Sequence, residues 1–183
     1  LEFRRVLFRS KIVPANCKPL PGALKAIREA DLIVLGPGSL YTSVLPNLLV
    51  SGLRDEIARA KAPCVYVCNI MTEPGETDNY TVADHLRVIM EHAGEDLVDA
   101  VLAAKEQIPK HVLERYWAEG ADIVRGNAAS VEKMGVAYFE SSFYTGGDVV
   151  RHDPDRLAKE LLRLLFRLKP VNERIALIDS YIL

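Results

Sequence analysis

Glycines and hydroxyl groups follow a short apolar run in the first third of the chain. Residues 31–35 (DLIVL) are almost wholly apolar, and Gly36-Pro37-Gly38-Ser39 comes directly after them. Glycine lets a ligand approach the backbone closely, and a helix start here would offer free N–H groups to an anion. The pattern matches neither GxGxxG nor GxxxxGKS/T, so an anion-binding loop and an ordinary strand-to-helix turn both stay open. The candidate ligand residues are Gly36, Gly38, Ser39, Thr42 and Ser43.

A second group of polar side chains follows the apolar run at residues 64–70 (CVYVCNI). The dipeptide Pro74-Gly75 marks a turn in this loop. Asparagine, threonine and glutamate side chains can pair with the hydroxyl and amide groups of a sugar or a base. The alternative interpretation is a solvated acidic loop. The polar residues concerned are Asn69, Thr72, Glu73, Glu76, Thr77 and Asp78.

A third feature is the segment VVRHD at residues 149–153. Arg151 could hold a phosphate through two N–H groups, although an exposed arginine beside a helix cap is the alternative interpretation. Asp84 and His85 are neighbours on an expected helix, where adjacent side chains do not face each other. We therefore expect no direct pair between them.

Strands and helices alternate along the chain, which predicts a mainly parallel sheet with helices on both faces. Both polar loops then follow the carboxyl ends of strands, where open α/β sheets bind their ligands. The expected strands are 31–35, 64–70, 97–103, 121–125 and 136–139. The expected helices are 21–30, 41–50, 52–61, 80–93, 109–120 and 154–168, with a helical turn at 130–134.

The composition is that of an ordinary globular domain, with 49% apolar residues, 26% charged residues and a net charge of −2. No basic stripe indicates nucleic-acid binding, and no apolar run approaches the roughly 20 residues that cross a bilayer. The cysteines are Cys17, Cys64 and Cys68, without a CxxC spacing. We interpret Cys64 and Cys68 as buried, reduced thiols in a cytoplasmic protein, and we expect no metal site.

The two ends of the chain are interpreted separately. Residues 1–10 (LEFRRVLFRS) can be back-translated to a common short-read sequencing-library adapter. The hypothesis is that they are not part of the natural protein, and they are excluded from functional interpretation. Residues 170–183 are interpreted as a tail of either native or artefactual origin.

Three segments together closely resemble the YvcK subgroup of the YvcK/CofD family, the gluconeogenesis factors. They are ADLIVLGPGSLYTSVLPNLLV, VYVCNIMTEPGETDNYTVADHL and the later RHD. The resemblance covers roughly residues 11–169 and implies a Rossmann-like, three-layer α/β/α sandwich. It also implies that these residues are the C-terminal part of a YvcK/CofD-like domain. The family's N-terminal half, with its GGGTG-type loop and a segment resembling ADDGGSSG, has no counterpart in this sequence.

The resemblance implies a cytoplasmic regulator that binds a UDP-sugar, with UDP-N-acetylglucosamine as the family's best-known ligand. Its expected role is in bacterial cell shape, cell-wall homeostasis and growth on gluconeogenic carbon sources. It implies no definite cofactor, metal ligand or catalytic residue, and it leaves a homodimer and protein partners open. The ligand residues that it assigns are Gly36, Gly38, Ser39, Thr42, Ser43, Asn47, Asn69, Thr72, Gly75, Glu76, Thr77 and Arg151. Of these, Arg151 is expected to bind the diphosphate of the ligand.

Two other functions remain as alternatives. The CofD branch of the family transfers a 2-phospho-L-lactyl group to a deazaflavin in coenzyme F420 synthesis. A protein that binds a dinucleotide such as NAD would also suit the predicted sheet, because a fold by itself does not assign a function.

Overall fold

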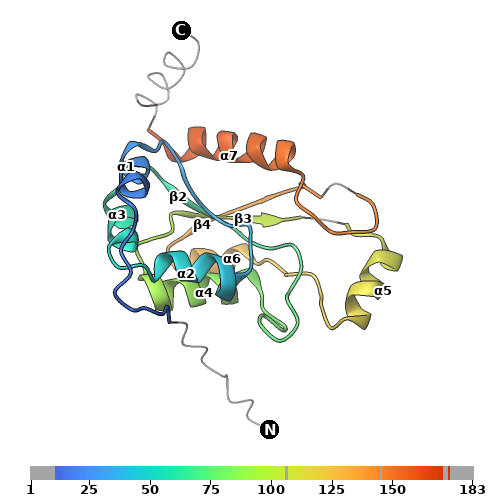
Figure 1. Ribbon diagram of the computed structural model, residues 1–183. Coiled ribbons are helices and arrows are strands. Elements are labelled where there is room, and N and C mark those ends of the chain that lie inside the picture. Colours follow the sequence, from blue (N-terminus) through green and yellow to red (C-terminus); the bar gives the residue numbers. More distant parts are fainter. Residues whose placement is uncertain (1–10, 106, 145, 171–172, 174–183) are drawn as a thin grey trace.

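The computed structural model of the chain describes residues 11–105, 107–144, 146–170 and 173. The hypothesis on residues 1–10 lies outside the described residues, and so does the interpretation of almost all of the tail at 170–183. The described residues form an α/β fold in which one sheet lies between two layers of helices (Figure 1).

The sheet has four strands in the order β1-β2-β3-β4. The strands are β1 (Ile33–Leu35), β2 (Cys64–Val67), β3 (Ala100–Ala104) and β4 (Ala137–Ser141). Every neighbouring pair is parallel, with Ile33 opposite Cys64, Val65 opposite Ala100 and Ala100 opposite Ala137. The predicted parallel sheet is confirmed. The strands β1, β2 and β3 consist of apolar residues, as expected where helices cover both faces of a sheet.

The helices connect the strands in the expected alternation. They are α1 (Pro21–Glu29), a π-helix η1 (Leu40–Val44), α2 (Leu45–Leu48), α3 (Leu53–Arg59), α4 (Val82–Ala93), α5 (Lys110–Ala118), α6 (Ala128–Glu132) and α7 (Pro154–Leu168). Within the described part of the chain, none of them combines the length and the apolar character needed to span a membrane.

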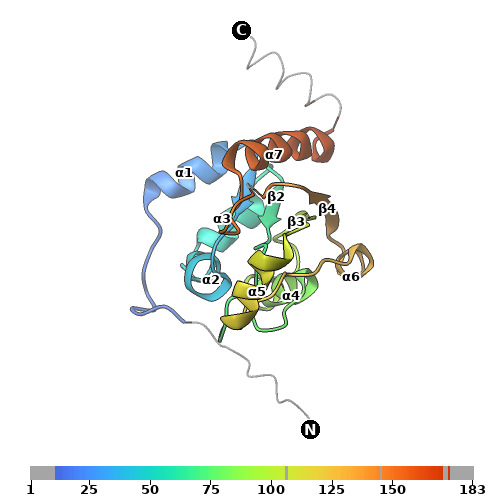
Figure 2. The ribbon, with the colours of Figure 1, turned by 90° about the vertical axis from the view of Figure 1, so that its right-hand side faces the viewer.

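Alternate strand residues face two separate cores. Tyr66 and Val101 pack on the face that α2, α3, α4 and α6 cover. Val65 and Leu102 pack on the opposite face, against α5 and α7. Figures 1 and 2 show α7 on one side of the sheet with α2 and α4 on the other. The strand order explains part of this division, because right-handed crossovers between successive strands place α2, α3, α4 and α6 on one face. Helix α5 also lies between β3 and β4 but packs on the opposite face, beside α7.

Polar side chains cap two of the helices. The Thr81 hydroxyl accepts a hydrogen bond from the Asp84 N–H, and the Asp84 carboxylate accepts one from the Thr81 N–H, so α4 begins with a capping box. Asp153 caps α7 by accepting hydrogen bonds from the N–H groups of Asp155 and Arg156. Such caps satisfy N–H groups that have no partner within the helix.

The predicted strand at 121–125 is wrong. This segment instead follows the loop after β2 through one antiparallel bridge, between Met71 and Ile123. The Thr72 N–H donates to the Asp122 carbonyl at 2.7 Å, and the Val124 N–H donates to the Ile70 carbonyl at 2.9 Å. The segment therefore supports the second polar loop and does not extend the sheet.

The predicted helix at 41–50 begins with an irregular turn and ends early. In η1 the Leu45 N–H donates to the Leu40 carbonyl, which is the wider spacing of a π-helix. Pro46 follows directly and has no N–H to donate to a preceding carbonyl. The wider turn thus precedes the proline, and α2 ends at Leu48.

His85 is a buried titratable group in α4. Its side chain is fully buried, and Nδ1 lies 2.9 Å from the Thr81 carbonyl oxygen. Nε2 has no hydrogen-bond partner among the described residues. Burial lowers the pKa of His85, although the Thr81 carbonyl and the Asp84 carboxylate oppose this shift.

We expect this histidine to make the fold less stable in acid. Because the pKa of His85 is lower in the folded state than the ordinary value near 6.5, the unfolded chain takes up its proton first as the pH falls. The free energy of unfolding should therefore decrease below about pH 6.5, and this contribution should be lost at the folded-state pKa. Urea unfolding from pH 8 to pH 5 measures the effect. His85→Asn should flatten the slope in this range, with His111→Asn on the surface of α5 as the control. An unchanged slope in His85→Asn would show that other groups cause the acid sensitivity.

Candidate functional site

The loop after β1 makes a tight turn beside the end of β2. Gly36 has a φ of +82°, and the peptide bond between Gly36 and Pro37 is cis. A Cβ atom on Gly36 would lie 2.8 Å from the Val67 carbonyl oxygen. Only glycine combines the left-handed conformation with so close an approach between two backbones. The backbone of the first candidate loop therefore passes in close contact with the backbone of the neighbouring strand.

Several N–H groups of this loop are used within the protein. The Ser39 carbonyl accepts from the N–H groups of Ser43 at 3.0 Å and Val44 at 2.9 Å. The Ser39 hydroxyl oxygen accepts from the Thr42 N–H at 3.3 Å. The Gly38 N–H is also engaged, with the side chain of Asn69. An anion at this turn would have to replace these bonds or use other donors.

Side-chain hydrogen bonds connect the two candidate loops. The Gly38 N–H donates to Asn69 Oδ1 at 3.1 Å, and Asn69 Nδ2 donates to Glu73 Oε1 at 3.3 Å. The Ser39 hydroxyl donates to Glu76 Oε2 at 2.9 Å. Four residues that were candidates from the sequence, Gly38, Ser39, Asn69 and Glu76, are thus brought together at the carboxyl ends of β1 and β2.

Two buried threonines hold the second loop in shape. Thr77 is buried, and its hydroxyl oxygen accepts from the Glu73 N–H at 2.8 Å. Thr72 is also buried, and its hydroxyl oxygen accepts from the Asp122 N–H at 2.9 Å. Gly75 lies at an exposed turn with a φ of +80°. Thr77 and Gly75 therefore shape the loop, whereas Thr72 also lines the cavity beside it.

Glu73 and Glu76 form a pair of carboxyl groups next to the Ser39 hydroxyl. Burial raises the pKa of Glu73, and the hydrogen bond and negative charge of Glu76 raise it further, while the Ser39 hydroxyl opposes the shift. Like charges at short distance disfavour full ionisation of both groups. The pair concentrates negative charge at the point where the two loops meet.

A cavity of about 370 Å³ opens beside this pair. Gly38, Asn69, Thr72 and Glu73 line it from the two loops. Other parts of its lining are far away in the sequence, namely Tyr116 and His152. The His152 ring is stacked on Phe143 with 5.3 Å between ring centroids, and its Nε2 lies 3.4 Å from the Cys68 carbonyl oxygen.

Sequence reasoning did not select Glu73, Tyr116 or His152 as ligand residues. Glu73 was visible only as one of several acidic residues in a crowded loop. Tyr116 lies in α5, and its hydroxyl oxygen accepts from the Val150 N–H at 2.9 Å, which ties that helix to the segment before α7. No local pattern in the sequence marks the contact of Tyr116. For His152, the one available signal was its place next to the candidate Arg151.

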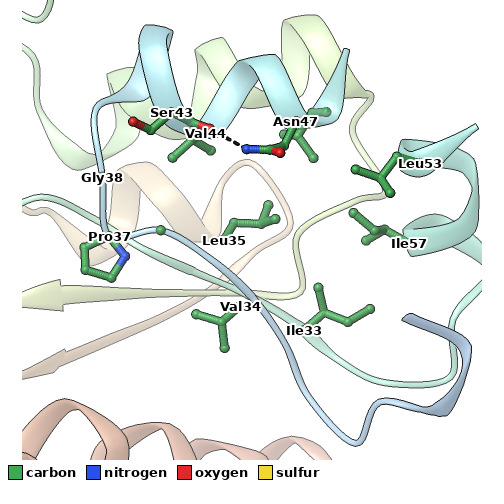
Figure 3. A pocket seen from close by; sticks show the side chains of 12 residues that line it. Ile33, Val34, Leu35, Pro37, Gly38, Ser43, Val44, Asn47, Leu53 and Ile57 are labelled. Carbon is green, nitrogen blue, oxygen red and sulfur yellow. Dashed lines mark hydrogen bonds between the residues drawn. The ribbon is translucent and has the colours of Figure 1, made fainter. Parts of the chain in front are cut away.

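A second cavity of about 350 Å³ lies between β1 and the helices η1, α2 and α3. Figure 3 shows Ile33, Leu35 and Val44 around its apolar part, with Ser43 and Asn47 on the helical side. The Asn47 Nδ2 group donates to the Ser43 carbonyl at 2.7 Å. Gly36 and Gly38 also line this cavity, whereas Thr42 is exposed nearby. Gly38 is thus the one candidate of the first loop that lines both cavities, whereas Ser39 and Thr42 line neither.

Arg151 lies at the surface, outside the lining of both cavities. Its neighbours Val150 and His152 both line the cavity beside Glu73. Arg151 is therefore next to this cavity in the chain, with an exposed side chain. A ligand that extends out of the cavity could reach it.

The buried cysteines have no reactive character in this structure. Burial raises the pKa of both Cys64 and Cys68 to about 12, and the charge of Asp99 adds to the shift at Cys64. A thiol with so high a pKa is protonated at neutral pH and is a poor nucleophile. Both side chains are part of the core, as the sequence indicated.

The chain is similar to known proteins over most of its length. The model of the family described as 2-phospho-L-lactate transferase CofD matches residues 4–144. The gluconeogenesis factor of Listeria monocytogenes is 46% identical over 158 residues, which are 86% of this chain and 48% of that protein. The gluconeogenesis factor of Bacillus subtilis is 41% identical over 165 residues, or 90% of this chain and 52% of that protein.

A solved structure has the same fold. The crystal structure of a UPF0052 family member from Bacillus halodurans superposes with a TM-score of 0.81 at 44% identity. The superposition covers 83% of this chain and 49% of the other. The chain spans about half the length of these relatives.

Proposed function

Because this chain belongs to the CofD family and is similar to its gluconeogenesis factors, we propose that it is part of a regulator that binds a nucleotide sugar. The ligand that we propose is UDP-N-acetylglucosamine or a close analogue. The proposed role is control of cell shape, cell-wall homeostasis and growth on gluconeogenic carbon sources. Binding rather than catalysis is the proposed activity.

One observation supports this proposal most strongly. Hydrogen bonds from Gly38 to Asn69 and from Ser39 to Glu76 join the two polar loops, and a cavity lies beside this junction. The junction is at the carboxyl ends of parallel strands, where open α/β sheets bind ligands. The cavity presents amide, hydroxyl and carboxylate groups, which suit a sugar.

Calorimetric titration of the full-length protein with UDP-N-acetylglucosamine tests the proposal. We expect saturable binding with a Kd on the order of micromolar, which corresponds to about −8 kcal/mol. UDP serves as the control ligand, because it keeps the base, the ribose and the diphosphate and lacks only the N-acetylglucosamine that the cavity would hold. The absence of any heat in a protein shown by circular dichroism to be folded would refute the proposal.

The second candidate is phospholactyl transfer to a deazaflavin. The match to the family described as 2-phospho-L-lactate transferase CofD favours it. Among the described residues, however, no group of three or more histidine, cysteine or carboxylate side chains is placed to hold a metal ion. An assay for phospholactyl transfer distinguishes the two functions, because a binding regulator would show no product.

A further inference from the structure

The cavity beside Glu73 has an unusual balance of charge for a nucleotide ligand. Its polar lining includes the Asn69 amide, the Thr72 hydroxyl and the Glu73 carboxyl group, and no lysine or arginine is among the described residues that line it. Phosphates are usually held by arginine, lysine or free N–H groups. The phosphates of a nucleotide sugar therefore fit poorly here, and an uncharged part of the ligand fits better.

The carboxyl group of Glu76 adds to the negative charge beside the cavity. Glu76 lies outside the cavity lining, but it is hydrogen-bonded to Ser39 and close enough to Glu73 to raise the pKa of that group. Where the two carboxyl groups share one proton, the pair still carries one negative charge. Any anionic group that enters the cavity meets that charge at short range.

His152 also lines this cavity. Its Nε2 lies 3.4 Å from the Cys68 carbonyl oxygen, and its ring is stacked on Phe143. The imidazole is thus oriented by groups of the protein itself. Arg151 is exposed and next to it in the chain, outside the lining, which leaves a cationic side chain outside the cavity for a diphosphate.

We propose that Glu73, supported by Glu76, makes this cavity accept the uncharged sugar of a nucleotide sugar and reject a sugar that carries a carboxylate. The proposal rests on the proposed function, because it assumes that the ligand is a nucleotide sugar. Discrimination of this kind works by repulsion against the wrong ligand, in addition to contacts with the right one. The cavity volume of about 370 Å³ is sufficient for a small part of a ligand rather than for all of it.

The test compares two ligands that differ in one group. UDP-N-acetylglucosamine and UDP-N-acetylglucosaminuronic acid differ only at carbon 6 of the sugar, which is a hydroxymethyl group in the first and a carboxylate in the second. We expect the full-length wild-type protein to bind the uncharged sugar at least about tenfold more tightly, as one like-charge contact in a half-exposed site would cause.

Glu73→Gln removes the charge and keeps an oxygen that can accept from Asn69 Nδ2. It should narrow the ratio of the two Kd values about fivefold, mainly by improving the binding of the acidic sugar. Glu76→Gln is the second variant and should act in the same direction, in case Glu73→Gln does not fold. Glu132→Gln, at an exposed position of α6, is the matched control and should leave the ratio unchanged.

The outcomes separate the two proposals. A wild-type protein that binds UDP-N-acetylglucosamine without preference over the acidic sugar overturns the role of Glu73. An unchanged ratio in folded Glu73→Gln and Glu76→Gln also overturns it, while the proposed function would stand. A folded wild-type protein that binds neither ligand refutes the proposed function, and the role of Glu73 with it.

Discussion

Replacing Gly36 with alanine should lower the free energy of unfolding by about 2–4 kcal/mol. The left-handed conformation at a φ of +82° costs a residue with a side chain about 1–2 kcal/mol. The new Cβ atom would also lie 2.8 Å from the Val67 carbonyl oxygen, which belongs to the backbone of β2 and cannot rotate away. Urea unfolding followed by circular dichroism measures the change. In the full-length protein, the same variant should also weaken ligand binding, because the turn positions Gly38 and Ser39.

Two other glycines provide matched controls. Gly52 has a φ of +88°, and no atom lies within 4 Å of its added Cβ position. Gly52→Ala therefore measures the conformational strain without the contact and should cost about 1–2 kcal/mol. Gly22 is in α1 with open space around it, so Gly22→Ala should be neutral or slightly stabilising. If Gly36→Ala costs no more than Gly52→Ala, the close approach to β2 is not what requires the glycine.

Much of the fold could be predicted because its signals are local. Buried parallel strands are short apolar runs, and residues 31–35 and 64–70 contain β1 and β2. The starts of α4 and α7 are marked in the sequence by the capping residues Thr81 and Asp153. These patterns depend on residues within one turn of each other, so a single sequence contains them completely.

The segment 121–125 could not be predicted in the same way. Its apolar pattern is that of a strand, but the bonds of Asp122 and Val124 are made to the loop after β2. The pairing partner is about 50 residues away and belongs to no strand of the sheet. The apolar pattern of a segment indicates that one of its faces is buried, but it does not identify the element against which that face packs.

The candidate site shows the same limit. The sequence placed Asn69 and Gly38 after strands, and parallel topology brings the ends of neighbouring strands together. Tyr116 and His152 reach the same cavity from α5 and from the segment before α7, which no local pattern connects to the loops. The pair formed by Glu73 and Glu76 depends on how the loop folds over Ser39. Spacing in the sequence does not distinguish this arrangement from a solvated acidic loop.

The division of charge in the site has a consequence for how a ligand would lie. The Gly38 N–H and the Thr42 N–H are bonded within the protein. The cavity beside them contains the carboxyl group of Glu73 and, among the described residues, no lysine or arginine. If the ligand is the nucleotide sugar that we propose, we expect its diphosphate to lie outside this cavity. Arg151 is exposed and is the neighbour in the chain of two lining residues, so it is the cation of the described residues that we expect to bind the diphosphate.

Replacing Arg151 with alanine in the full-length protein should weaken binding of UDP-N-acetylglucosamine roughly 10-fold to 100-fold, the loss expected for one hydrogen-bonded charge. The guanidinium group can hold a diphosphate through two parallel N–H bonds, and alanine leaves that charge without a partner. Because Arg151 is exposed, the variant should unfold at the same urea concentration as the wild type. Calorimetric titration measures the Kd, and the unfolding midpoint shows whether the fold is intact.

Two further variants determine whether charge or geometry matters at this position. Arg151→Lys keeps the charge but loses the two-bond geometry, so it should recover only part of the affinity. Arg59→Ala removes an exposed arginine at the end of α3, away from both loops, and should bind like the wild type. Equal affinity in Arg151→Ala and the wild type would remove Arg151 from the site. The diphosphate would then be held by other groups of the full-length protein.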